Sequence, residues 1–161
     1  MTKIGVISDT HLRMPDDRMF KLAEKQFRDV SMVLHAGDLV SIRVLDPFHD
    51  KQVVAVCGNM CERDSTQVLS PKEVITVDGV RIGLIHGWGS RSGLEDRIFP
   101  EFDDVEAIVY GHTHTPANHL RQGVLMFNPG AYTAYSMGRE AGSVGILTVT
   151  ENGITGEIIP L

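Results

Sequence analysis

The sequence predicts a mixed α/β protein in which two packed sheets carry helices on their outer sides. In the first half, short β-branched runs alternate with amphipathic segments, and this β-α-β-α-β order is typical of parallel strands covered by helices. The middle changes character at Asp78-Gly79, a dipeptide that favours a tight antiparallel hairpin. A second hairpin signal follows at Asn152-Gly153. Parallel and antiparallel pairing together therefore predict mixed sheets.

The elements of the first half are read in order from these patterns. Strands are expected in 3–8, 31–37 and 51–58, and amphipathic segments in 16–27 and 41–50. Pro15 and Asp16 mark the N-terminal boundary of the first helix. Its predicted apolar face consists of Met19, Phe20, Ala23 and Phe27.

The second half supplies the remaining strands. The segment 73–87 reads as two strands joined at Asp78-Gly79, and 92–102 as a helix. Strands follow in 105–111 and 123–130, and the final hairpin occupies 143–160. With 161 residues, 42% of them hydrophobic, the chain is expected to form one domain over 1–161 without structural disulfides.

Composition also limits the function. The apolar run in the N-terminal segment MTKIGVISDTH is too short and too polar for a signal peptide or a membrane span. This predicts a cytoplasmic protein without membrane association. In such a protein Cys57 and Cys61 are expected to be reduced thiols. The formal charge is −6, and Lys and Arg are scattered. Stable nucleic-acid binding is therefore not expected, and any positive charge for phosphate must come from elsewhere.

Polar residues of ligand type follow five of the apolar runs. They are Asp9 and His11, Asp38, Asn59, His86, and His112 with His114. Strand ends of α/β sheets converge on a ligand crevice, so these side chains are expected to meet. Residues i and i+2 of an extended segment project to one side, which would let Asp9 and His11 hold one ion. Seven such groups exceed one tetrahedral site, and Asp38 is the natural bridge between two ions.

A structural interpretation exists for each residue taken alone. An Asp or Asn after a strand commonly caps a turn or helix, and a single histidine such as His86 commonly lies hydrogen-bonded in a core. The convergence of five strand ends favours the metal site. Carboxylate, imidazole and carboxamide ligands without thiolate suit manganese, iron, cobalt, nickel or zinc.

The ordered motifs DTH, GD at 37–38, GN at 58–59, HG at 86–87 and GHTH at 111–114 resemble those of the calcineurin-like metallophosphoesterase family. The motif NPGA at 128–131 and the chain length resemble its small bacterial and archaeal phosphodiesterase branch. The resemblance implies a four-layer αββα sandwich of two mixed β-sheets flanked by helices. It also implies a hydrolase with two divalent metal ions, manganese first among them, and a possible homo-oligomer.

Residue roles follow from the resemblance. Asp9, His11, Asp38 and His114 would hold one metal, and Asp38, Asn59, His86 and His112 the other; Asp38, Asn59 and His86 are assigned to catalysis. A metal-bridging hydroxide would attack a small phosphoester or nucleotide, with a diester favoured over a monoester. Two dications bring roughly +4 against about −3 from Asp9, Asp38 and hydroxide, which leaves the site positive in an acidic protein.

One motif departs from the family pattern. Larger members carry GNHE where this chain has GNMC, and Met60 cannot transfer a proton to a leaving group. The general acid is therefore unassigned, and Cys61 stands where an acid is common. His35 is a candidate supporting residue, whereas His49 and His119 match no ligand position. The candidate substrate contacts are Arg13, Arg63, Arg91 and Arg139.

The alternative function is a non-catalytic protein-binding scaffold of the same fold, as in a retromer subunit.

Overall fold

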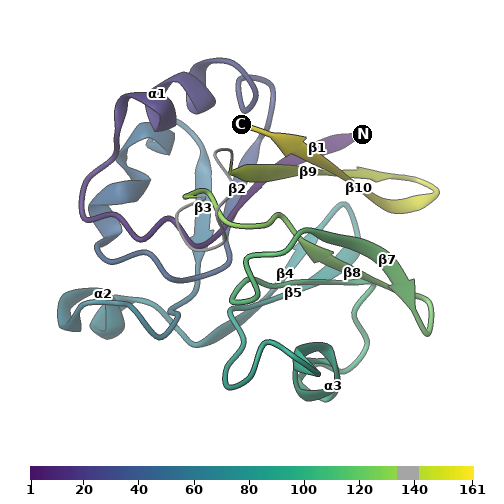
Figure 1. The fold of residues 1–161 in the computed structure, drawn as a ribbon. Helices are drawn as coiled ribbons and strands as arrows, with labels where there is room; N and C mark the ends of the chain where they lie inside the picture. Colours follow the sequence, from purple (N-terminus) through teal and green to yellow (C-terminus); the bar gives the residue numbers. More distant parts are fainter. Residues whose placement is uncertain (134–141) are drawn as a thin grey trace.

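Two five-stranded mixed sheets pack face to face in the computed structural model, which describes residues 1–133 and 142–161 (Figure 1). The first sheet has the order β10-β9-β1-β2-β3, with β1 parallel to β2 and β2 parallel to β3. Its strands are β1 (Thr2–Ile7), β2 (Met32–His35), β3 (Gln52–Ala55), β9 (Ser143–Thr150) and β10 (Gly153–Pro160). The three parallel strands carry the first three polar strand ends to one edge.

The second sheet has the order β4-β5-β6-β8-β7, in which β5, β6 and β8 are parallel. Its strands are β4 (Lys72–Val77), β5 (Val80–Ile85), β6 (Ala107–Val109), β7 (Ala117–Arg121) and β8 (Val124–Asn128). Asp78 and Gly79 join β4 to β5 with φ of 49° and 86°, the left-handed pair that a type I′ hairpin requires. The predicted hairpin at this position is therefore confirmed.

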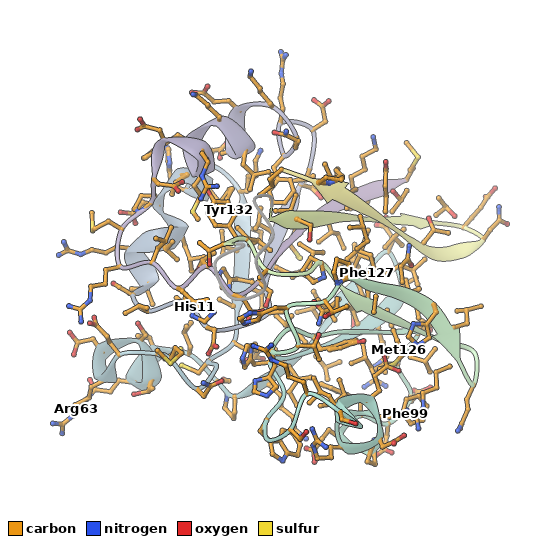
Figure 2. All side chains as sticks on the ribbon, viewed as in Figure 1. His11, Arg63, Phe99, Met126, Phe127 and Tyr132 are labelled. Carbon is orange, nitrogen blue, oxygen red and sulfur yellow. The ribbon has the colours of Figure 1, made fainter. Side chains whose placement is uncertain are left out.

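The side-chain alternation of the strands builds four layers. Residues such as Ile4, Val6 and Phe127 form the central core between the sheets. Phe127 is labelled in Figure 2. The opposite face of the first sheet packs through Ile7 and Val33 on α1 (Asp17–Glu24) and the 3₁₀ helix η1 (Ile42–Phe48). The outer face of the second sheet packs on α3 (Leu94–Ile98) and η2 (Phe99–Glu101). The predicted two-sheet sandwich with outer helices is confirmed.

Several local predictions differ from the structure. The first helix ends at Glu24, and Met19 and Leu22 are its buried side chains, whereas Phe20 is 47% exposed. The final hairpin pairs Gly153 with Thr150, so its loop lies one residue before the predicted Asn152-Gly153 turn. Helix α2 (Arg63–Val68) and strand β7 were not predicted, because both are short and mostly polar. Among the described residues, no helix is long and apolar enough to cross a membrane.

Candidate metal centre

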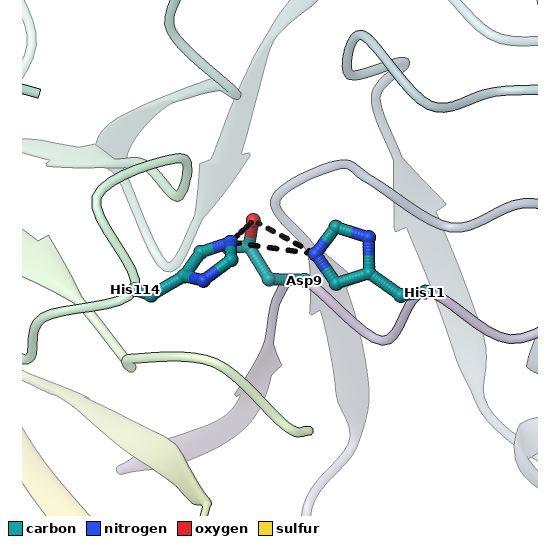
Figure 3. A group of neighbouring side chains, drawn as sticks. All are labelled: Asp9, His11 and His114. Carbon is teal, nitrogen blue, oxygen red and sulfur yellow. Dashed lines mark hydrogen bonds and ion pairs between the residues drawn. The ribbon is translucent and has the colours of Figure 1, made fainter. Parts of the chain in front are cut away.

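Asp9, His11 and His114 meet although β1 and the loop after β6 are far apart in sequence (Figure 3). Their ligand-type atoms lie within 4.8 Å of one another. His114 Nε2 is 3.0 Å and His11 Nε2 is 3.8 Å from Asp9 Oδ1, and the two histidine Nε2 atoms are 3.3 Å apart. Two imidazoles and one carboxylate thus face a common point.

A second group consists of Asp9, Asp38 and His86, again within 4.8 Å. Asp38 Oδ2 lies 3.3 Å from His86 Nε2 and 4.0 Å from His11 Nε2. Asp38 therefore stands between an imidazole of each group, which is the position expected of a shared ligand. The His112 ring contacts the His86 ring edge-on, with centroids 5.3 Å apart.

The backbone at these residues is left-handed rather than extended. Asp9, His11, Asp38, His112 and His114 have φ between 50° and 67°. Such values are uncommon for residues other than glycine and cluster at functional sites. The prediction that extended i, i+2 spacing aligns Asp9 with His11 is therefore wrong in its geometry. Backbone turns past the strand ends bring these side chains together.

Hydrogen bonds fix one oxygen of each carboxylate. Asp9 Oδ2 accepts from Ser8 Oγ at 2.6 Å and from the backbone N–H of His112 at 3.2 Å. Asp38 Oδ1 accepts from the backbone N–H of Met60 at 2.9 Å. The other oxygens, Asp9 Oδ1 and Asp38 Oδ2, are the ones that face the imidazoles. Each carboxylate is thus oriented by the protein while its second oxygen stays available to a cation.

Backbone carbonyls select the tautomers of two histidines. His86 Nδ1 lies 2.7 Å from Ala36 O, and His112 Nε2 lies 2.7 Å from Gly89 O. Because a carbonyl only accepts, these nitrogens carry the protons. The nitrogen left for a cation is then Nε2 of His86 and Nδ1 of His112.

One observation that does not depend on the sequence motifs also indicates that the site suits divalent cations. Among the described residues, the only buried side-chain N or O atoms without a hydrogen-bond partner are Asp9 Oδ1 and His86 Nε2. Both lie in the Asp9-Asp38-His86 group, where each has charged neighbours but no hydrogen-bond geometry. Unpaired buried polar atoms are costly, and a bound cation would satisfy both.

Electrostatics keep the carboxylates ionised. Burial alone would raise the pKa of Asp9, but contacts with His114, His86 and Ser8 outweigh it and the pKa lies below its usual value. For Asp38 burial is likewise outweighed, chiefly by His86, and its pKa is also lowered. Burial opposes protonation of His86, yet Asp38 and Asp9 raise its pKa. The cluster therefore concentrates negative charge on two nearly inaccessible carboxylates.

Two residues support the ligand loops from behind. His35 is fully buried; its Nδ1 accepts from Gly37 N–H and its Nε2 lies 3.1 Å from Thr10 Oγ1, so it links the Asp38 turn to the Asp9 loop. Burial lowers its pKa to about 3, which keeps the ring neutral. Asn128 donates to Gly111 O at 2.9 Å and Thr113 Oγ1 at 3.0 Å. In the sequence, the NPGA motif was the only feature that drew attention to Asn128.

The other predicted residues lie in different settings. Asn59 is exposed on the turn beside Met60. His49 and His119 are exposed and contact Asp46 O and Glu95 respectively, away from the cluster. Arg13 pairs with Glu62 at 2.8 Å, and Arg63 begins α2 and points outward (Figure 2). Arg139 lies outside the described residues.

Gly58 makes close approach to a ligand possible, and its replacement gives a first prediction. A Cβ at Gly58 would lie 2.2 Å from Asp38 Oδ1. Gly58→Ala should displace this carboxylate and weaken metal binding by about 10- to 100-fold. Gly79→Ala is the control: nothing lies within 4 Å, but φ of 86° makes alanine strained there. It should cost about 1 kcal/mol of stability and leave metal affinity unchanged. Calorimetric metal titration and thermal unfolding of both variants separate the effects; equal metal affinities would contradict the assignment.

A four-layer sandwich with an Asp/His cluster at the edge of both sheets defines a class of metal-dependent phosphoesterases. Residues 2–152 match the calcineurin-like phosphoesterase superfamily domain, and the chain belongs to this family. A relative from Methanocaldococcus jannaschii, named as a probable metallophosphoesterase (MJ0623), is 36% identical over 137 residues, covering 81% of this chain and 68% of the relative.

Solved structures share the fold over nearly the whole chain. The structure of an archaeal phosphodiesterase superposes with a TM-score of 0.76 at 28% identity, covering 99% of this chain and 100% of the other. Vps29 of Entamoeba histolytica, solved with Zn²⁺, gives a TM-score of 0.72 at 24% identity, covering 99% of both chains. The second likeness is one of fold alone.

Proposed function

We propose that this protein is a phosphodiesterase that uses two divalent cations to hydrolyse a small phosphodiester. The observation that carries the proposal is the pair of buried carboxylates, Asp9 and Asp38, whose free oxygens face imidazoles from three different loops. Membership of the phosphoesterase family and the likeness to an archaeal phosphodiesterase support it.

The proposed ligand sets are those that the family motifs imply. Each takes two or three members from one of the two groups seen in the structure, whose common member is Asp9. Asp9, His11, Asp38 and His114 would hold one cation, and Asp38, Asn59, His86 and His112 the other, with manganese the first candidate. When bound, two divalent cations supply an activated water as nucleophile and positive charge for the phosphoryl oxygens. Asp38 lies between His11 and His86, which suits it as the shared ligand.

The chain's own residues hold this arrangement ready. Ser8 and the His112 N–H orient Asp9, and the Met60 N–H orients Asp38. The carbonyls of Ala36 and Gly89 fix the rings of His86 and His112. Ligands placed in advance need little reorganisation when charge develops on the phosphoryl group, which is the main source of electrostatic catalysis.

The alternative is a non-catalytic scaffold of the same fold, for which the likeness to Vps29 is the observation. A scaffold has no need for seven ligand-type residues or for buried carboxylates held with strained backbone. The complete ligand set therefore favours the enzyme.

Hydrolysis of aryl phosphodiesters tests both the proposed activity and the expectation that the protein lacks a general acid. With Mn²⁺ present, the protein should hydrolyse bis(p-nitrophenyl) phosphate, and faster than p-nitrophenyl phosphate. Met60 has no proton to give, so the factor of about 10²–10⁴ that a general acid contributes for basic leaving groups is absent. Log turnover for a series of aryl diesters should therefore rise steeply with leaving-group acidity. No turnover of any diester would favour the scaffold; a flat series with chemistry rate-limiting would reveal a proton donor.

A further inference from the structure

Trp88, the only tryptophan of the chain, lies on a loop that belongs to the metal centre. His86 is two residues before it, so the two Cα atoms are within roughly 8 Å of each other. Gly89, the next residue, accepts a hydrogen bond from His112 Nε2 at 2.7 Å. Proposed ligands of the same cation thus flank Trp88.

Arg97 holds this loop in place. Its guanidinium donates to the carbonyls of Trp88 and Ser92, both at 3.1 Å, and to that of Ser90. One side chain from α3 thus fixes three carbonyls of the loop. A loop anchored in this way presents its outward side chain in a defined place.

Trp88 is nevertheless 46% exposed. It is absent from all three hydrophobic clusters of the described residues. Met60, on the loop of Asn59, is also exposed, at 50%, while its N–H contacts Asp38. Two large apolar side chains therefore stand exposed on loops of the metal centre. Ligand sites combine such apolar surface with a few fixed polar groups.

A cleft of about 640 Å³ continues from the same loop. Its lining includes Arg91, Ser92 and Gly93, together with Thr113, which stands between His112 and His114 in the sequence. The charges of its lining residues balance, because Arg91 and Arg121 are matched in number by Glu95 and Asp96. Arg121 pairs with Asp96 at 2.8 Å. The cleft offers no net positive charge for a second phosphate and suits an uncharged ester group.

We propose that the Trp88 indole stacks on a planar ester group of the substrate, so that the natural substrates are phosphodiesters bearing an aromatic ring, as in a nucleoside or aryl ester. This inference rests on the proposed phosphodiesterase function and names its substrate class. Stacking on an aromatic side chain accepts any planar ring, because every such ring offers a π face. Trp88 would then determine specificity without taking part in phosphoryl transfer.

Binding of two phosphonates to the metal-loaded protein tests this inference. Phenylphosphonate and methylphosphonate share the metal-binding group and differ only in the ring. By calorimetry, wild type should bind phenylphosphonate about 5- to 150-fold more tightly, the range expected for one stacked ring. Phenylphosphonate alone should also shift the fluorescence of Trp88. In Trp88→Ala the affinity ratio should fall to near 1, whereas Trp88→Phe should keep most of it.

Phe20→Ala is the matched control, because Phe20 is 47% exposed on α1, on the outer side of the other sheet. It should leave the ratio as in wild type, and metal content should be equal in all variants. Equal affinities of wild type for the two phosphonates, or an unchanged ratio in Trp88→Ala, would overturn the role of Trp88 while the proposed function stands. Failure of both phosphonates to bind would overturn the metal-centred function and this inference with it.

Discussion

Chelation of divalent metal is expected to abolish phosphodiester hydrolysis, and addition of Mn²⁺ to restore it. The protein prepared without chelator should contain about two metal ions per chain, because the ligand-type residues form two groups that share the carboxylate of Asp9. Without cations, Asp9 Oδ1 and His86 Nε2 are buried and have charged neighbours but no hydrogen-bond partner. Elemental analysis, followed by turnover before and after chelation and readdition, measures both expectations.

Metal loading should also stabilise the fold. A ligand that binds only the native state adds about 2.7 kcal/mol at a concentration 100 times its Kd. The thermal midpoint of the chelated protein should therefore rise with added Mn²⁺, which is a readout independent of turnover. Full activity of a protein shown to be metal-free would refute the proposed mechanism. Metal binding with stabilisation but without hydrolysis of any diester would instead point to the scaffold.

The sequence predicted the layers better than the boundaries of individual elements. Strands buried on both faces, such as β2 with Met32–His35, carry continuous apolar runs that identify them. Strand β7 has an exposed and polar middle, so no alternation marked it. Phe20 looked like a core residue by helical spacing, yet the core-facing side of α1 uses Met19 and Leu22. Tertiary packing decided which face of this helix is buried.

For the site, the sequence predicted which residue types meet but not how they meet. Convergence of strand ends followed from the order of parallel strands. The left-handed backbone at Asp9 and Asp38 could not be read from the sequence, because the surrounding structure imposes it. Ser8 was also missed, since a serine near a strand end has no distinctive pattern. The NPGA motif drew attention to Asn128 but did not show which loop atoms it contacts. The loop of Trp88 required the contacts of Arg97, a helical residue nine positions later.

Asp38→Asn should lower kcat by at least about 100-fold, the scale of losing one important electrostatic group in an active site. The change is isosteric, and the oxygen of the new carboxamide can still accept from the Met60 N–H, as Asp38 Oδ1 does at 2.9 Å. The amide nitrogen would replace Oδ2, which lies between His86 and His11. An amide N–H₂ has no lone pair for a cation, so both proposed metal positions lose a ligand at once.

Asp104→Asn is the matched control for this variant. Asp104 has φ of 56° and Asp38 has φ of 55°, so both substitutions place asparagine in the same backbone region, which asparagine tolerates. Asp104 is exposed and pairs with Arg81 at 2.8 Å, an interaction of little energetic weight. Its variant should keep wild-type turnover and metal content. Asp38→Asn also removes the contacts with His86 that lower the pKa of this carboxyl, so the metal-free fold should lose some stability. Turnover is therefore compared at a temperature where both variants are folded. An activity loss there, together with a reduced metal content, would come from the lost ligand, whereas equal turnover of the two variants would show that Asp38 is not shared between cations.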